Sequence, residues 1–186
     1  MKIVPLFILM LVSGAASFCY CHSARIIDTL SGPVQGFFTY LHEDPVEVFL
    51  GIPFAEPPIG NLRFQKPKRV KPWNGTLLAT NIPPACVQYT PYPFPWADNL
   101  PGQSEDCLYL NIYVPTDRKK GSKLAVLFWI YGGGLTYGSN RMDIYDARPL
   151  AILGNVIVVT INYRLGAFGF LTSNTEDAPG NVGKNN

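Results

Sequence analysis

The decisive stretch of this sequence is Trp129-Ile130-Tyr131-Gly132-Gly133-Gly134-Leu135. It continues an uncharged apolar run, Leu124 to Phe128, which predicts a strand buried on both faces of a sheet. Three glycines at the end of such a strand free the backbone from Cβ constraints, so that N–H groups can approach a ligand closely. Fixed N–H donors suit the oxyanion that develops in acyl transfer. The alternative is a glycine-rich turn that binds nothing.

The residues that follow predict a β-α-β unit and hence an α/β fold. Asp146 to Leu153 is typical of a short helix, with Pro149 in its first turn and Gly154 as its stop. Val156 to Ile161 is a second fully apolar strand, which a helical connection would place parallel to the first. Strands buried on both faces need helices on both faces, and only one short helix is predicted.

Upstream, the sequence predicts an antiparallel β-hairpin. Its first strand begins at Gly32 and runs through Tyr40, residues 42–45 form the turn, and Val46 to Ile52 is the return strand. A further strand is predicted from Leu108 to Val114, which Pro115 ends. Because the chain offers strands and little to cover them, we expect the N-terminal piece of a larger protein, with a large exposed apolar surface that favours aggregation when expressed alone.

Composition and charge exclude several classes of protein. The apolar fraction is 47%, the charged fraction 15% and the net charge +2. This charge is too small to indicate nucleic acid as a partner. The 17 prolines and 17 glycines predict many loops, yet the apolar runs exclude a disordered chain.

The first residues are typical of a secretory signal peptide, assigned to residues 1–17. Lys2 precedes the apolar run Ile3 to Val12, and small residues follow up to Ser17. The run is too short for a bilayer, which needs about 20 residues. The alternatives are a membrane anchor and a buried strand. No second segment is long enough to cross a membrane, so we expect a secreted protein.

Secretion makes disulfides and glycans reasonable. A Cys86–Cys107 bond would close a loop of moderate size and contribute roughly 3 kcal/mol on a chain-entropy estimate. Cys19, Cys21 and His22 could suggest a metal site, but no second ligand pair lies at zinc spacing, so we interpret them as leader or tail residues. Asn74-Gly75-Thr76 is the only N-x-[ST] sequon and predicts a glycan on a loop; the alternative is an unused sequon.

The loop between these two cysteines is rich in proline and aromatic residues. A long loop closed at its base is an Ω-loop candidate, and such loops often have a function. Two interpretations stay open: the aromatic side chains line a substrate pocket, or they pack inward and hold the loop. They are Tyr89, Tyr92, Phe94 and Trp96.

Several segments occur together in one order along the chain. They are Gly51 to Gly60, Arg63-Phe64, Ser104 to Pro115, Tyr131 to Gly134, Asn162 to Phe170 and Ala178 to Asn181. In this order the sequence resembles the type-B carboxylesterase/cholinesterase family of α/β-hydrolases. The resemblance implies that residues 18–186 are the N-terminal portion of such a domain: the N-terminal hairpin and the first strands of the central mixed sheet, incomplete.

The resemblance also implies roles for individual residues. Gly133 and Gly134 match oxyanion-hole glycines. Tyr145, Tyr89 and, loosely, Trp96 match substrate-binding aromatics of cholinesterases. The remaining matches are the first disulfide, Cys86–Cys107, and a buried structural ion pair, Arg63–Glu105, in which loss of one partner should be costly.

The sequence also departs from the cholinesterase pattern. Pro91 replaces an acidic residue of the loop, and Leu135 and Thr136 replace aromatic residues after the glycines. The Asp expected to pair with Arg164 is absent, and no Gly-x-Ser-x-Gly occurs. Neither His22 nor His42 lies where a general base is expected.

We therefore expect a chain that supplies half of an oxyanion hole, is truncated before the nucleophile elbow and is inactive by itself. The parent would be a secreted serine hydrolase acting on small carboxylic esters without metal or organic cofactor. The alternatives are a catalytically inactive, cholinesterase-like adhesion protein and a truncated inactive isoform. Nothing in the sequence indicates an oligomeric state.

Overall fold

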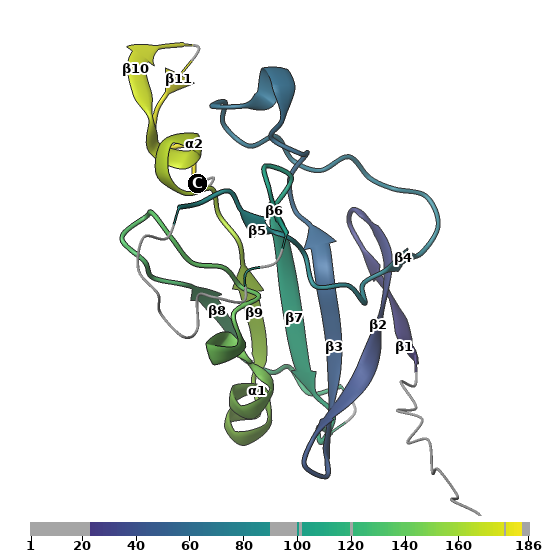
Figure 1. The fold of residues 1–186 in the computed structure, drawn as a ribbon. Helices are drawn as coiled ribbons and strands as arrows, with labels where there is room; N and C mark the ends of the chain where they lie inside the picture. Colours follow the sequence, from purple (N-terminus) through teal and green to yellow (C-terminus); the bar gives the residue numbers. More distant parts are fainter. Residues whose placement is uncertain (1–22, 90–99, 101, 120, 177, 184–186) are drawn as a thin grey trace, which may run out of the picture.

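The structure, a computed structural model, contains one mixed sheet of seven strands. It describes residues 23–89, 100, 102–119, 121–176 and 178–183. The sheet has the order β1-β2-β3-β7-β9-β8, with β4 paired to β2 (Figure 1). The predicted signal peptide and Trp96 lie outside the described residues. No helix in the described ranges is long and apolar enough to span a bilayer.

Besides the main sheet, the structure has two small two-stranded sheets, two short helices and two 3₁₀ turns. The sheet strands are β1 (Ser23–Thr29), β2 (Gly32–Leu41), β3 (Asp44–Pro53), β4 (Leu77–Leu78), β7 (Tyr109–Pro115), β8 (Val126–Ile130) and β9 (Ile157–Ile161). Two small sheets add β5 (Ala85–Cys86) with β6 (Gln103–Ser104), and β10 (Thr172–Thr175) with β11 (Ala178–Pro179). The helices are α1 (Arg148–Gly154) and α2 (Gly166–Phe170), and the 3₁₀ turns are η1 (Gly60–Leu62) and η2 (Asp143–Tyr145).

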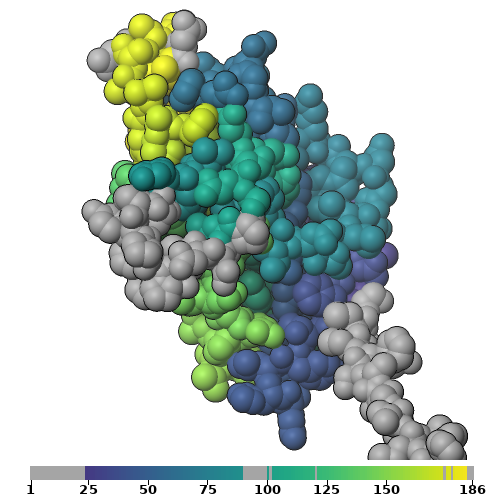
Figure 2. Space-filling view, in the orientation of Figure 1, coloured from purple at the N-terminus to yellow at the C-terminus, as the bar shows by residue number. Residues whose placement is uncertain are grey.

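The predicted hairpin is confirmed as β2 and β3. The two strands pair antiparallel with Phe37 opposite Val48, and their turn lies at the lower end of the molecule beside α1 (Figures 1 and 2). Arg148 of α1 reaches across to this hairpin and donates to the carbonyl of Tyr40 at 3.3 Å. Strand β1, which pairs antiparallel with β2, was not predicted, because its charged residues obscure the alternation.

The predicted β-α-β unit is also confirmed. β8 and β9 pair parallel in register from Val126–Ile157 to Ile130–Ile161, and α1 connects them. Pro149 lies in the first turn of α1, as predicted. The helix ends one residue later than predicted: Gly154 is its last residue, and Asn155 adopts the left-handed conformation of the cap with φ 46°.

The two largest clusters of core side chains lie one on each face of the sheet. On the α1 face, Val48, Tyr113 and Val158 pack against Ala151 of the helix. On the opposite face the buried residues include Phe49 and Val114, and residues of the 54–80 segment pack beside them. This opposite face holds an open apolar trough of about 610 Å³. The fold class is therefore that of a partial α/β-hydrolase, as the sequence predicted.

The prediction that the first apolar strand is buried on both faces is wrong for β8. Val126 is 60% exposed and Phe128 54% exposed. β8 is the last strand of the sheet order, so that only β9 pairs with it among the described residues. An apolar strand is suited to a position covered on both faces of a sheet. Its actual exposure depends on which neighbouring elements are present.

Candidate functional site

The candidate site lies where β8 and β9 end. Because the two strands are parallel, their carboxyl ends meet at the upper edge of the sheet, near β5, β6 and α2 (Figure 1). Ligands of open α/β sheets bind outside the carboxyl ends of the strands. The segment that leaves β8 at this edge is Gly132 to Gly138, which we call the glycine loop.

Glycine is required at some positions of this loop and not at others. Gly133 has φ +141°, and a Cβ there would lie 1.9 Å from the carbonyl oxygen of Tyr137. Gly134 has φ +59°, in the left-handed region that disfavours side chains, although the space around it is open. Gly132 has open space and no such dihedral. The strictest demand for glycine therefore falls on Gly133.

Two carbonyl groups of the loop accept hydrogen bonds, whereas the N–H groups of Gly133 and Gly134 donate none among the described residues. The carbonyl of Gly133 accepts hydrogen bonds from the backbone N–H groups of Thr136 at 3.1 Å and Tyr137 at 3.2 Å. The carbonyl of Leu135 accepts from Gly166 at 2.8 Å. Within the described ranges, the N–H groups of Gly133 and Gly134 donate to no protein acceptor. Both donors are thus available to a ligand.

Two buried tyrosines fix the start of the loop. The hydroxyl of Tyr163 donates to the carbonyl of Tyr131 at 2.9 Å, and the hydroxyl of Tyr131 donates to the carbonyl of Tyr163 at 3.3 Å. Their rings stack with centroids 4.6 Å apart. Burial raises the pKa of both hydroxyls, so they remain protonated donors. The strand end just before Gly132 is therefore held to the end of β9.

Tyr145 is the predicted substrate-binding residue that the structure brings to this region. Its ring stacks on Tyr131 at 6.3 Å and packs at a tilt on Trp129 at 5.6 Å. It lies at the end of η2 and is half-buried, which raises the pKa of its hydroxyl. Part of the residue therefore remains accessible to solvent.

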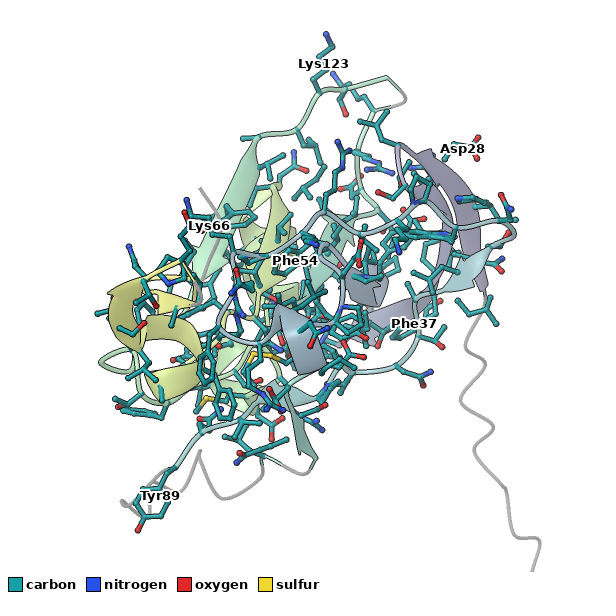
Figure 3. The ribbon with its side chains drawn as sticks, turned by 90° about the horizontal axis from the view of Figure 1, so that it is seen from above. Asp28, Phe37, Phe54, Lys66, Tyr89 and Lys123 are labelled. Carbon is teal, nitrogen blue, oxygen red and sulfur yellow. A yellow bond between two sulfur atoms is a disulfide. The ribbon has the colours of Figure 1, made fainter. Side chains whose placement is uncertain are left out.

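Tyr89, the second predicted substrate-binding residue, does not pack against the tyrosines at the start of the glycine loop. Its side chain is 80% exposed and projects from the body of the molecule (Figure 3). The base of the loop that carries it is closed by the Cys86–Cys107 disulfide and by the parallel pairing of β5 with β6. The implied disulfide is therefore present, while a substrate contact by Tyr89 stays a prediction.

Arg63 and Glu105 form the implied ion pair but are not buried. The guanidinium donates to both carboxylate oxygens, at 2.5 and 2.6 Å, and the side chains are 44% and 22% exposed. The expectation of a buried pair is wrong here because both residues lie on surface segments. Hydrogen bonding to Glu105 raises the pKa of Arg63.

Arg164, by contrast, is buried and incompletely paired. Its Nη2 donates to the carbonyls of Gln65 at 2.6 Å and Val182 at 2.5 Å, while Nε and Nη1 have no hydrogen-bond partner among the described residues. Burial lowers the pKa of its guanidinium. A buried cation with two free donors is suited to a carboxylate partner, as the resemblance implied.

The remaining candidates lie away from the site. Asn74 is exposed in a bend, where a glycan could be attached. His42 occupies the β2–β3 turn, at the end of the sheet opposite the glycine loop (Figure 1). In the ranges described here, no group of His, Cys, Asp and Glu side chains is arranged to hold a metal ion.

Sequence reasoning missed the polar side chains that hold the end of the glycine loop and the segment just after it. The Oδ1 of Asn162, a buried residue after β9, accepts hydrogen bonds from the N–H of Asn140 at 2.9 Å and from Ser139 at 3.3 Å. Its Nδ2 donates to the carbonyl of Pro84 at 3.0 Å. Gln88 contacts Gly138 directly. The only signal in the sequence was the place of Gln88 beside Cys86, which does not reveal its partner.

With this geometry established, comparison with known proteins decides the family. The chain matches the description "Carboxylesterase family" over residues 23–185. It belongs to the carboxylesterase family. The family resemblance predicted from the sequence is thus confirmed.

The relatives include enzymes of both expected branches. An acetylcholinesterase of Bungarus fasciatus is 47% identical over 165 residues, which cover 84% of this chain and 27% of the relative. Acetylcholinesterase 1 of Caenorhabditis briggsae is 50% identical over 146 residues, covering 75% of this chain and 23% of the relative. Carboxylesterase 1D of Rattus norvegicus is 42% identical over 197 residues, covering 98% of this chain and 34% of the relative. This member of the carboxylesterase family thus spans about a quarter to a third of these relatives.

Proposed function

We propose that this chain is the N-terminal part of a secreted serine hydrolase that cleaves small carboxylic esters. The observation that carries the proposal is that the N–H groups of Gly133 and Gly134 donate to no acceptor in the described residues, on a loop in which the carbonyls of Gly133 and Leu135 are hydrogen-bonded. Membership of the carboxylesterase family supports the reaction class. The relatives named acetylcholinesterase and carboxylesterase support an ester substrate without distinguishing choline esters from others.

In the proposed mechanism, a serine from the remainder of the protein attacks the ester carbonyl. A histidine first removes the serine proton and then donates it to the leaving alcohol. The carbonyl oxygen becomes an oxyanion, which accepts hydrogen bonds from the N–H groups of Gly133 and Gly134. Because these donors are oriented before the reaction, little reorganisation is needed as the charge develops.

The loop geometry fits this role for a second reason. The carbonyl of Gly133 is turned toward Thr136 and Tyr137, so its negative end is occupied by donors of its own loop. An oxyanion beside Gly133 and Gly134 would therefore meet N–H groups rather than a free carbonyl oxygen. Tyr145, accessible beside the β8 end, is proposed to contact the substrate, together with Tyr89 and Trp96 of the disulfide-closed loop.

The exposed β8 supports the proposal that the domain continues beyond this chain. In a complete protein a further strand would pair with the free edge of β8, and helices would cover its apolar side chains. That remainder would supply the nucleophile, the acid and the base. We propose that the 186-residue chain alone is inactive. Hydrolysis of a simple aryl ester in proportion to folded, purified chain would contradict this.

Secretion and glycosylation form part of the proposal. A disulfide suits an oxidising compartment, and residues 1–17 have the pattern of a signal peptide. The exposed sequon at Asn74 is then a glycan site. Loss of a mass of glycan size on Asn74→Gln substitution in secreted material would establish it.

The rival function is adhesion or binding without catalysis, through the same fold. A binding protein needs no free amides at the end of β8, so the geometry at Gly133 favours the enzyme. The discriminating observation is the residue at the nucleophile elbow of the complete protein: serine in Gly-x-Ser-x-Gly for the hydrolase, another residue for the binding protein.

The decisive experiment compares two glycines of the same loop in the complete protein. Gly133→Ala forces a Cβ into the Tyr137 carbonyl and should lower kcat for an aryl ester about 100-fold or more, with little change in KM. Gly132→Ala adds a methyl group to open space and should cost far less. Equal effects of the two substitutions would contradict the assigned role of Gly133.

A further inference from the structure

The side chain of Gln88 forms a two-way hydrogen-bonded bridge to the last residue of the glycine loop. The N–H of Gly138 donates to Oε1 at 2.7 Å, and Nε2 donates to the carbonyl of Gly138 at 2.8 Å. A backbone N–H can only donate and a carbonyl can only accept, so this pairing fixes which end of the amide faces each group. Gln88 thereby satisfies both backbone polar groups of one residue.

Gln88 is itself tied to the base of the disulfide-closed loop. Its Nε2 also donates to the carbonyl of Cys86 at 3.0 Å, and its backbone N–H donates to Oε1 of Gln103 at 2.9 Å. Cys86 and Gln103 lie on the paired strands β5 and β6. The bridge therefore joins two segments about 50 residues apart in sequence: the disulfide-closed loop and the glycine loop.

Gly138 has little freedom to compensate for loss of this bridge. Its φ is +126°, and a Cβ there would lie 2.4 Å from the ring of Tyr131. The backbone of Gly138 therefore packs directly on the tyrosine that fixes the start of the loop. The loop is held at its start by Tyr131 and Tyr163 and at its end by Gln88.

The neighbouring anchor, Asn162, acts on a different segment. It binds the backbone N–H of Asn140, beyond the glycine loop, and the carbonyl of Pro84. The hydrogen bonds of Gly138 in the described structure run to Gln88 alone. Movement of Gly138 would pass to Tyr137, whose N–H binds the carbonyl of Gly133.

We propose that Gln88 is a positioning residue: it holds Gly138 so that the N–H groups of Gly133 and Gly134 stay aimed at the reacting oxygen. The loop that carries the rim aromatic Tyr89 and the loop that carries the oxyanion donors are thereby coupled through one side chain. The catalytic part of this inference rests on the proposed function, and the anchoring part does not. Gln88 touches no reacting atom, so its effect is on geometry.

The test uses the complete protein with two readouts, hydrogen exchange of residues 132–138 and the kinetics of aryl-ester hydrolysis. Gln88→Met keeps the length of the side chain and removes both hydrogen bonds to Gly138. We expect exchange of its hydrogen-bonded N–H groups, those of Thr136, Tyr137 and Gly138, to rise about tenfold or more. We expect kcat to fall about 10- to 100-fold with KM nearly unchanged, because oxyanion donors act in the transition state.

A matched control is Gln35→Met. Gln35 lies on β2 and, like Gln88, donates through Nε2 to a backbone carbonyl, that of Ala24, at 3.1 Å. It is remote from the glycine loop, so neither readout should change. A merely destabilising effect of glutamine loss would instead appear in both variants.

Gln88→Glu provides a second, graded test. At neutral pH the introduced carboxylate still accepts from the N–H of Gly138 but cannot donate to its carbonyl. Protonation at lower pH restores one donor, so protection of the Thr136, Tyr137 and Gly138 N–H groups, corrected for intrinsic exchange, should recover on going from pH 7.5 to about 4, just below the ordinary pKa of a glutamic acid. The wild-type protein should show no such recovery.

The outcomes separate this inference from the proposed function. Unchanged exchange in Gln88→Met and Gln88→Glu overturns the anchoring role whatever the activity. Faster exchange with unchanged kcat overturns the positioning role. A wild-type protein that hydrolyses no ester refutes the proposed function and with it the catalytic part of the inference, while the exchange data still decide whether Gln88 anchors the loop.

Discussion

β8 and β9 are neighbouring, parallel strands of the same length and similar apolar composition, yet they differ in exposure. β9 lies between β7 and β8, and Val158 in its middle is 1% exposed. β8 has a partner on one side only, and Val126 at its start is 60% exposed. Both strands lead into the candidate site at the same edge of the sheet.

The difference shows that composition and burial are separate properties of a strand. The apolar residues of β9 are buried because β7 and β8 pair with it on either side and α1 covers one face. A β8 with similar residues presents an unpaired edge and apolar side chains, which is the arrangement expected of an aggregation-prone or an incompletely covered strand. We attribute it to cover that the remainder of the proposed complete domain would provide.

The largest expected effect comes from a charge placed on β9. Val158→Asp buries an unpaired carboxylate beside Tyr113 and Ala151. In the isolated chain the free energy of unfolding should fall by about 4 kcal/mol or more, a large share of the roughly 5–15 kcal/mol of an ordinary domain. Urea unfolding followed by tryptophan fluorescence measures this.

The matched substitution on β8 sharpens the comparison. Val126→Asp places its carboxylate in solvent and should change the stability of the isolated chain by less than about 0.5 kcal/mol, while it reduces self-association. In the complete protein the same substitution should be as damaging as Val158→Asp. A small effect of Val126→Asp in both forms would show that β8 remains an exposed edge strand.

A smaller effect is expected from the pH dependence of the cluster that covers β9. Burial, aided by the charge of Asp146 and opposed by Arg148, raises the pKa of Tyr113 to about 12 from its ordinary 10.0. A raised pKa of an acid means that the folded state favours the protonated form. The resulting contribution of Tyr113 to the free energy of unfolding is complete below pH 10 and is lost as the pH rises from 10 towards 12.

Tyr113→Phe isolates this contribution. The wild-type chain should lose about 1 kcal/mol more stability than the variant between pH 9 and pH 11. Other tyrosines, including Tyr109, titrate in both proteins and cancel in the difference. Parallel stability curves for the two proteins over this range would show that Tyr113 ionises as it does in the unfolded chain.

The sequence was sufficient to predict the main elements of the fold, but not the exposure of strand β8. The hairpin of β2 and β3, the β8–α1–β9 unit and the family all followed from apolar periodicity, turn residues and ordered segments. α2 was missed because Gly166 to Phe170 contains two glycines and no helical periodicity. The exposure of β8 could not be predicted from its residues, since exposure depends on elements outside the strand.

For the candidate site, the sequence indicated the proposed donors but not the side chains that hold the surrounding backbone. The glycine triplet after an apolar strand indicated a ligand-binding loop, and the family resemblance singled out Gly133 and Gly134 within it. Gln88 and Asn162 could not, because their partners are backbone groups 50 and 22 residues away, and such contacts leave no pattern in one sequence. The exposed Arg63–Glu105 pair shows that a resemblance can give a contact correctly and its burial wrongly.

The proposed ester hydrolysis depends on what the N–H groups of Gly133 and Gly134 bind. The most direct measurement is a crystal structure of the complete protein after reaction with an organophosphonate that mimics the tetrahedral intermediate. The account predicts the phosphonyl oxygen about 2.7–3.1 Å from both nitrogen atoms, with Gln88 still bridged to Gly138. A phosphonyl oxygen held by other donors, with the two glycine N–H groups facing water or their own backbone, would contradict it.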